Sequence, residues 1–252
     1  MALWFSFFKG NSEASAASGA SPGSAIPSTP SGNGLPRWVA QAEKNPGDPL
    51  VRRRAGEELE RRGDSSGAVA QWLASADLYT AAGLPLKALA VLAAALRLDP
   101  TRDDVRARIA RLDLPFFAEL SAQEAEAVAR HLEVRKFVAG EILLREKEVA
   151  GALSFLMDGV VRILARTHGP RPVKIGSLRP GDLFGLGSAL DGIASVATLA
   201  AEEPGELLVW PRAALDAVCR EMPGVRKALA SFRSAVSLRC LDGSLARLRS
   251  VL

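Results

Sequence analysis

The stretch FLMDGVVRILARTHGPRPVKIGSLRPGDLFG (155–185) decides the fold that this sequence predicts. In and around it lie three short apolar runs of β type, at 153–158, 160–166 and 173–177, separated mostly by Gly or Pro turns. Short strands at such a spacing are typical of a β-sandwich or a β-barrel. The other runs of this kind lie at 134–137, 141–145, 194–200 and 207–210.

Helical patterns enclose these strands. Residues 114–134 form an amphipathic segment in which Ser121 is placed as an N-cap and Glu124 follows three residues later, as in a capping box. Helices are expected again at 212–221 and 224–252. The sequence therefore predicts an α+β fold, in which a helical region precedes a β domain that C-terminal helices follow.

Four motif pieces, in a fixed order, carry a family resemblance: VAGEILLRE (138–146), FLMDGVVRIL (155–164), LRPGDLFG (178–185) and ASVATLAAEE (194–203). Their turn glycines are suited to a positive φ, which glycine adopts without steric cost; they are Gly140, Gly159, Gly181 and Gly185. By these pieces, residues 114–235 resemble the cyclic-nucleotide-binding domain. The resemblance implies a jelly-roll-like β-roll at 114–223, closed by helices at 224–252.

The family's ligand cassette begins Phe-Gly-Glu and ends Arg-Ala-Ala-Thr, and it aligns without a gap onto FGLGSALDGIASVAT (184–198). In this alignment the family's ribose-binding Glu falls on Leu186, and its phosphate-binding Arg falls on Ser195. The resemblance gives these ligand-contact positions: Phe184, Gly185, Leu186, Gly187, Ser188, Ser195, Val196, Ala197 and Thr198.

Losing both polar contacts weakens a cyclic nucleotide site. Each 1.4 kcal/mol is about tenfold in affinity, so the two losses could move a micromolar site into the millimolar range. We therefore expect a degenerate cassette without a physiological ligand. Two alternatives stay open: a different or larger ligand, and ordinary cyclic AMP or GMP held by Ser188, Ser195 and a helix start after Gly185. The nearby basic residues Arg171, Lys174 and Arg179, with His168 in the same turn, are expected to lie in a solvated loop; the alternative is that a basic residue among them faces the phosphate.

Residues 37–113 have a helical pattern, with candidates at 49–62, 66–82, 85–97 and 102–112 after a short first helix. Each pair takes about 34 residues, the period of the tetratricopeptide repeat. The residues that match this repeat's offsets are Trp72, Tyr79, Gly83, Ala88, Leu92, Ala95 and Pro100. The region resembles about two repeats, fewer than a free-standing solenoid needs, so we expect it to lean on its neighbour.

The N-terminus begins with an aromatic tip at residues 1–10, MALWFSFFKG. It is followed at 11–36 by Ser, Ala, Gly and Pro with almost no charge, a composition typical of a disordered linker. A tethered aromatic tip is a candidate docking motif for a protein or a membrane surface. The alternatives are that it folds back on its own body or is disordered. The candidate docking residues are Leu3, Trp4, Phe5, Phe7 and Phe8.

The tail holds two apolar stripes. The first, Val225, Leu229, Phe232 and Val236, is expected to cover the roll; the second, in 241–252, packs on the helices or forms a homodimer seam. With about 30 residues after Pro223, we expect no DNA-binding domain like those of the family's transcription factors. Basic residues on the tail and on 102–111 are expected to be solvated, with an acidic partner or nucleic acid as the alternative.

Composition excludes several other functions. The net charge is only +4, and no apolar run reaches the roughly 20 residues that a membrane helix needs. The two cysteines, which lie far apart, exclude a disulfide scaffold and a Cys-rich zinc site and suit a reducing cytoplasm. The two separated histidines argue against a His-ligated metal centre or a His-based catalytic triad. The sequence holds no catalytic motif that we recognise. We therefore expect a cytoplasmic bacterial protein that is not an enzyme and has no cofactor.

These expectations combine into one functional hypothesis. The chain is expected to act as an adaptor or regulatory scaffold that binds protein partners through its tetratricopeptide-like region and its N-terminal tip. The alternative is a genuine sensor of cyclic AMP, cyclic GMP or a cyclic dinucleotide, which relays ligand binding to a partner.

Overall fold

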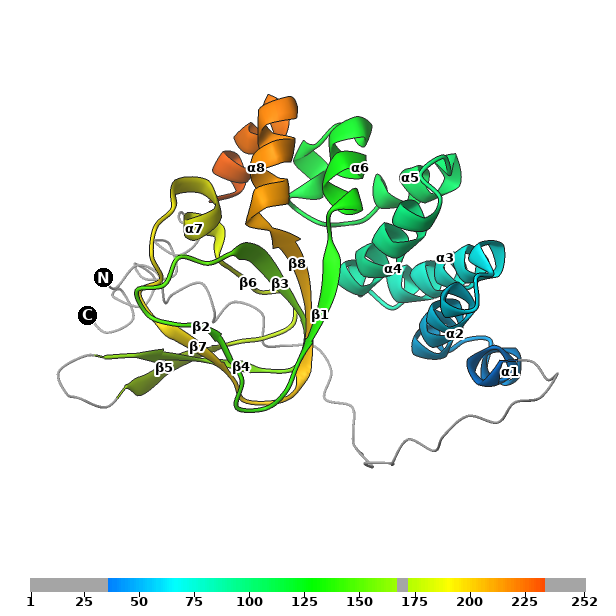
Figure 1. Ribbon diagram of the computed structural model, residues 1–252, viewed down its shortest axis with the longest axis horizontal. Coiled ribbons are helices and arrows are strands. Elements are labelled where there is room, and N and C mark those ends of the chain that lie inside the picture. Colours follow the sequence, from blue (N-terminus) through cyan, green and yellow to red (C-terminus); the bar gives the residue numbers. More distant parts are fainter. Residues whose placement is uncertain (1–35, 167–171, 234–252) are drawn as a thin grey trace, which may run out of the picture.

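The computed structural model of the chain describes residues 36–166 and 172–233. Five helices come first, and a β-roll with its own helices follows (Figure 1). This arrangement confirms the expected α+β fold. The helices of the first region are α1 (Arg37–Lys44), α2 (Pro49–Arg61), α3 (Ser65–Ala81), α4 (Pro85–Leu98) and α5 (Asp103–Ile109).

Local signals set the ends of these helices. Asp48 caps α2, because its carboxylate accepts hydrogen bonds from the main-chain nitrogens of Leu50 and Val51. Asp64 caps α3 in the same way through the nitrogen of Gly67. Gly63 and Gly83 follow α2 and α3 with positive φ, which allows the chain to reverse direction.

The helical hairpin of α3 and α4 contains the positions that match the tetratricopeptide offsets. Trp72 lies against Gly56 of α2, where a larger side chain would collide with the indole, and its Nε1 donates to the carbonyl oxygen of Arg53 at 3.3 Å. Helix α4 is apolar on nearly all sides and is almost completely buried, which makes it the centre of this region. The matching positions that are buried are Trp72, Tyr79, Ala88, Leu92 and Ala95.

The β-roll consists of two four-stranded antiparallel sheets. Sheet A has the order β1-β8-β3-β6, and sheet B has the order β2-β7-β4-β5. The strands of sheet A are β1 (Glu133–Phe137), β8 (Gly205–Pro211), β3 (Ala152–Asp158) and β6 (Leu183–Phe184). The strands of sheet B are β2 (Ile142–Leu144), β7 (Thr198–Ala201), β4 (Val161–Ala165) and β5 (Val173–Leu178).

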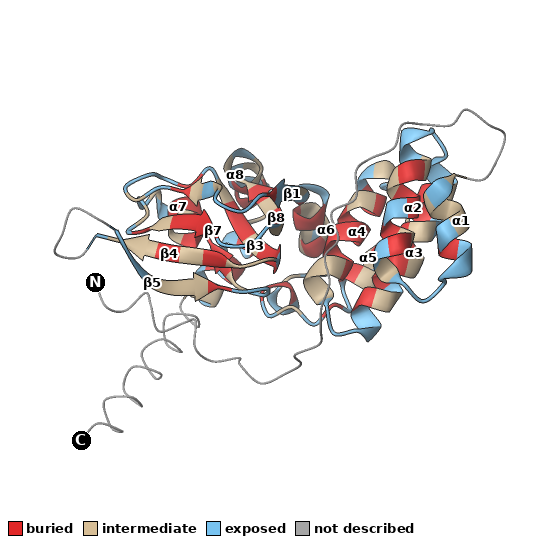
Figure 2. Cartoon of the chain, turned by 90° about the horizontal axis from the view of Figure 1, so that it is seen from below, coloured by how far each residue is buried: buried red, intermediate tan, exposed pale blue. Residues whose placement is uncertain are grey.

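Sheet A separates two apolar cores. Its inner face and sheet B enclose the roll core, which includes Phe137, Leu156 and Phe184. Its outer face, which includes Leu153 and Trp210, belongs to a larger outer core that extends through the helices. Figure 2 shows these buried segments following one another from α3 and α4 to the strands. The two regions of the chain are therefore joined by a continuous apolar core.

Two ion pairs hold the helical region at one end of sheet A. The Arg53 guanidinium of α2 binds the Glu206 carboxylate with contacts of 2.6 and 3.2 Å, and Lys87 of α4 lies 3.3 Å from Asp158. Asp158 and Glu206 are register partners on β3 and β8. Two neighbouring acids on the sheet thus each meet a cation from the helices. The expectation that the helical region leans on its neighbour is confirmed.

Further helices also cover the outer face of sheet A. They are η2 (Phe117–Glu119), α6 (Ala122–Arg130) and α8 (Arg212–Glu221), together with helical residues 223–233. The predicted capping box at Ser121 and Glu124 is confirmed. In the first tail stripe, Val225 and Leu229 are buried in the outer core. The ring centre of Phe232 lies 6.2 Å from that of Phe116. Val236 and the second stripe lie outside the described residues.

The predicted strand at 194–200 is wrong in its first half. Strand β7 begins at Thr198, and residues 194–197 form a turn instead. The Ser195 hydroxyl donates to the carbonyl oxygen of Ala197 at 2.7 Å, a local bond that competes with strand pairing. The two-residue strand β6 was not predicted. No helix within the described ranges has both the length and the apolar character that crossing a bilayer requires.

Candidate functional site

The cassette 184–198 runs from β6 through helix α7 (Leu186–Asp191) to β7. Gly185 joins β6 to α7 with a φ of 87°, and a Cβ at this position would collide with the carbonyl oxygen of Ala152 on β3. A glycine is therefore required here for two reasons, conformation and space. The predicted positive φ values at Gly140, Gly159 and Gly181 are confirmed as well.

The family resemblance aligns Leu186 with a ribose-binding Glu. The structure places it in the outer core, with only 4% of its surface exposed. Phe184 and Ala197, at the two ends of the cassette, belong instead to the roll core. The side chain at 186 therefore packs among apolar groups outside the roll interior, where a carboxylate would be costly.

The two cassette serines both donate their hydroxyl protons to main-chain carbonyls. Ser188 Oγ donates to the oxygen of Ile193 at 2.6 Å, and Ser195 Oγ donates to the oxygen of Ala197 at 2.7 Å. A hydroxyl has one proton to donate, so each serine presents lone pairs to any further group. An anionic phosphate would have to break these bonds before either serine could donate to it.

The remaining cassette positions are also structural or apolar. Thr198 Oγ1 accepts a hydrogen bond from the main-chain nitrogen of Glu146 at 3.0 Å. Gly187 lies beside Ile193, and Val196 is exposed to 48% of its surface. Ile193 is exposed as well. Val196 and Ile193, which flank the Ser195 turn, thus give it an apolar rim.

A loop that the sequence analysis missed borders the Ser195 turn. The main-chain nitrogen of Lys147 donates to the carbonyl oxygen of Ser195 at 2.7 Å, and the nitrogen of Ser195 donates to the oxygen of Glu148 at 2.8 Å. Lys147 has a φ of 67°, the single positive value at a non-glycine residue in the described chain. No local sequence signal could have found this pairing, because about 50 residues separate the two segments in the chain.

The basic residues considered as phosphate partners have other positions. Lys174 Nζ lies 2.6 Å from Glu202, so its charge is already paired. The main-chain nitrogen of Arg179 donates to Asp182, whose pKa is raised by burial. Arg171 and His168 lie outside the described residues. Of these candidates, the two within the described residues, Lys174 and Arg179, form no hydrogen bond or ion pair with the cassette.

Several arginines of the helical region also form ion pairs. On and before α5, Arg102 binds Asp104, Arg106 binds Asp103 and Glu126, and Arg108 binds Asp77. Farther along, Arg233 pairs with Asp191 of α7. Carboxylates of the chain itself thus meet much of the positive charge that nucleic acid would need.

Comparison with known proteins places the roll in a family. Residues 134–222 match the family model described as "Cyclic nucleotide-binding domain". These residues form a cyclic nucleotide-binding domain. The match takes in the whole cassette and begins in β1, so it covers the strands and α8. The tetratricopeptide-like character of the preceding helices stays a prediction.

Two curated relatives align with part of the chain. The chain is 30% identical over 90 residues to the cAMP-dependent protein kinase regulatory subunit of Mycosarcoma maydis, which covers 36% of this chain and 17% of that protein. It is 31% identical over 118 residues to the Cyclic AMP receptor protein of Thermus thermophilus, which covers 46% of this chain and 54% of that protein. The chain thus spans about half, or less, of the length of these relatives.

Among solved structures, the Thermus thermophilus catabolite activator protein has a TM-score of 0.45 and 29% identity, over 54% of this chain and 63% of that chain. The sensor domain of the transcriptional regulator DNR from Pseudomonas aeruginosa has a TM-score of 0.42 and 20% identity, over 51% of this chain and 87% of that chain.

The described residues give little support for metal binding or thiol chemistry. Residues 36–166 and 172–233 contain no group of three or more His, Cys, Asp and Glu side chains that could hold a metal ion. Cys219 is buried, and burial raises the pKa of its thiol, which disfavours the reactive thiolate. The aromatic tip with its candidate docking residues lies outside the described part of the chain, so its role stays a prediction.

Proposed function

We propose that this chain is a non-enzymatic regulatory adaptor whose cyclic nucleotide-binding domain has no physiological cyclic nucleotide ligand. In this proposal the roll is a structural and interaction domain, and the helical region docks a protein partner. The N-terminal tip is a second docking element. The curated relatives are regulators by name, which supports the regulatory class.

One observation carries the proposal: the cassette offers neither a ribose acceptor nor a phosphate donor at the two aligned positions. Leu186 is packed in the outer core, and the Ser195 hydroxyl proton is bound to Ala197. A buried phosphate needs charge-assisted hydrogen bonds to offset the loss of its hydration. Without an arginine at 195 that cost stays uncompensated.

The second candidate is a genuine cyclic nucleotide sensor. It is favoured by the family match over residues 134–222 and by the names of the relatives, which refer to cyclic AMP. In this function the ligand would move the C-terminal helical residues, which pack against Phe116, and so change the docking of a partner. The two candidates differ in whether the roll binds a nucleotide at all.

Isothermal titration calorimetry of the full chain decides between them. Cyclic AMP, cyclic GMP and a cyclic dinucleotide are titrated separately, with the corresponding linear 5′-nucleotide as the control. We expect no saturable heat below millimolar concentration for any of them. Micromolar binding of one cyclic nucleotide, with none of its linear control, would overturn the adaptor proposal in favour of the sensor.

The adaptor role itself is tested by affinity capture of partners with two chains, full length and lacking residues 1–10. We expect a defined partner to be retained by the full chain and retained more weakly after removal of the tip. Equal retention would assign docking to the helical region alone, and retention of nothing by either chain would contradict the adaptor role.

A further inference from the structure

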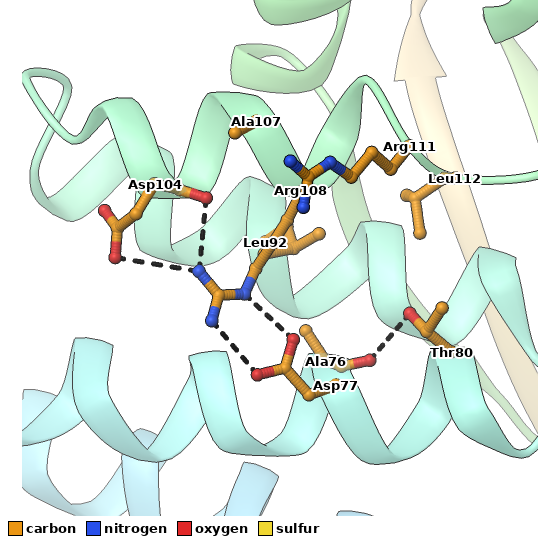
Figure 3. A pocket seen from close by; sticks show the side chains of 9 residues that line it. All are labelled: Ala76, Asp77, Thr80, Leu92, Asp104, Ala107, Arg108, Arg111 and Leu112. Carbon is orange, nitrogen blue, oxygen red and sulfur yellow. Dashed lines mark hydrogen bonds and ion pairs between the residues drawn. The ribbon is translucent and has the colours of Figure 1, made fainter.

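A groove lies on the helical region, outside the cassette, between α3 and α5 (Figure 3). Its volume is about 390 Å³. The buried side chains of Ala76, Leu92 and Leu112 give it an apolar floor. The other residues that line it are Asp77, Thr80, Asp104, Ala107, Arg108 and Arg111.

The acids of the groove are already neutralised. Arg108 forms two contacts with the Asp77 carboxylate, at 2.9 and 3.1 Å, and lies 3.8 Å from that of Asp104. The carboxylate of Asp104 also binds Arg102 at 2.7 Å, and this hydrogen bond holds the pKa of Asp104 below its usual range. The groove therefore has no free acid to attract a cation.

Arg111 differs from Arg108 although both line the groove. It is exposed, and among the described residues it has no ion pair and no side-chain hydrogen bond. In Figure 3 the Arg111 guanidinium carries no dashed contact, while dashed lines join that of Arg108 to Asp77 and to Asp104. One unpaired cation thus stands beside an apolar floor.

We propose that this groove binds an acidic peptide of a protein partner. A carboxylate of the peptide pairs with Arg111, and a neighbouring apolar side chain rests on Ala76, Leu92 and Leu112. A guanidinium binds a carboxylate through two parallel hydrogen bonds, which fixes the orientation of the peptide. The proposal rests on the part of the proposed function that assigns partner docking to the helical region.

The charge of the groove argues against the chain's own N-terminal tip as the occupant. Residues 1–10 contain Lys9 and no Asp or Glu. Their approach would bring a second cation toward Arg111 and would leave that arginine unpaired. A partner that supplies the missing negative charge fits the groove better, so occupation by the tip is an outcome that the test must be able to reveal.

The test is fluorescence anisotropy of the full chain with a labelled peptide in which Glu residues flank Trp and Leu. The matched probe carries Lys in place of Glu, and the tip sequence MALWFSFFKG is a third probe. We expect the acidic peptide to bind about tenfold more tightly than the Lys peptide, because one charge pair is lost and a repulsion is added. Preference for the Lys peptide or for the tip would overturn the proposal.

Two pairs of variants locate the site. Arg111→Glu should weaken the acidic peptide about tenfold, while Arg61→Glu, which changes the same charge at an exposed position of α2, should leave binding unchanged. Ala107→Trp should block the groove, while Ala110→Trp at an exposed position of the same segment should not. Equal effects within each pair would contradict the site. Calorimetry with cyclic nucleotides reads the roll separately, so either proposal can fail alone.

Discussion

Leu186 and Ser195 stand at the two cassette positions where the family resemblance expects polar ligand contacts, and the structure gives them different surroundings. Leu186 contributes a buried apolar side chain to the core that joins the roll to the helices, so it has a structural task. Ser195 is partly exposed and closes a turn through its hydroxyl. The two positions therefore differ in how readily they can be changed, and each gives its own prediction.

Ser195→Arg should create measurable binding of cyclic AMP. The new guanidinium supplies the missing charge at the aligned phosphate position, and we expect about a tenfold gain or more over the wild type. Calorimetry measures the gain, and Ser195→Gln is the control of similar length without the charge. If the Arg variant binds cyclic AMP no more tightly than the Gln variant, Ser195 is not the position that limits phosphate binding.

Leu186→Glu should destabilise the fold before it helps any ligand. The substitution removes apolar packing and places a carboxylate at a position that is 4% exposed. We expect a loss of about 3–5 kcal/mol in the free energy of unfolding, compared with about 2–4 kcal/mol for Leu186→Ala. Urea denaturation measures both. A Glu variant as stable as the wild type would show that the side chain at 186 can turn toward solvent or the roll interior.

The ends of the elements follow local chemistry. At α6, the nitrogen and hydroxyl of Ser121 donate to the Glu124 carboxylate, and these bonds hold the pKa of Glu124 below its ordinary value of 4.5. A carboxyl whose pKa is lowered by folding stabilises the fold above its ordinary pKa. This contribution is lost as the pH falls through the lower pKa of the folded state.

Glu124→Gln should therefore destabilise the fold at pH 7 and much less near pH 3. The site is close to solvent, so we expect a difference of only about 0.5 kcal/mol at pH 7. Urea denaturation at the two pH values measures it, with Glu119→Gln as an exposed control. If the loss in free energy of unfolding caused by Glu124→Gln grew as the pH fell, the result would contradict the stabilising role of this cap.

Local signals also explain how much the sequence could predict. The helix bounds around Asp48, Gly63 and Gly83 lie within about two residues of those expected, because caps and stops are written in neighbouring residues. Strand β6 was missed because a strand of two residues is too short to show the alternation of apolar and polar side chains that predicts a strand. The placement of Leu186 outside the roll core could not be predicted, since it depends on which side of sheet A the cassette helix meets.

At the scale of the whole molecule, the helices and the roll share one apolar core. The outer core includes side chains from α3 and α4, from β3 and β8, and from the helical residues after 223. The Arg53–Glu206 ion pair adds a specific link between the two regions. Burial alone would lower the pKa of Arg53, but the hydrogen bond to Glu206 and its negative charge outweigh burial and raise that pKa. We therefore expect the two regions to unfold together.

Arg53→Met should destabilise the chain by about 2–4 kcal/mol, because it leaves Glu206 without its main partner in a largely buried site. Thermal unfolding followed by tryptophan fluorescence and by far-ultraviolet circular dichroism measures the change and tests whether the two signals coincide. Arg61→Met, at an exposed position, should cost less than about 0.5 kcal/mol. Two separate transitions in the wild type would contradict a shared core.

Under the proposed function, the cyclic nucleotide-binding domain serves without a bound nucleotide. The most direct measurement is mass spectrometry of the small molecules released when the full chain, purified from the cells that produce it naturally, is denatured. We expect far less than one equivalent of any cyclic nucleotide per chain. Recovery of about one equivalent of a single cyclic nucleotide would contradict the claim and identify the chain as a receptor.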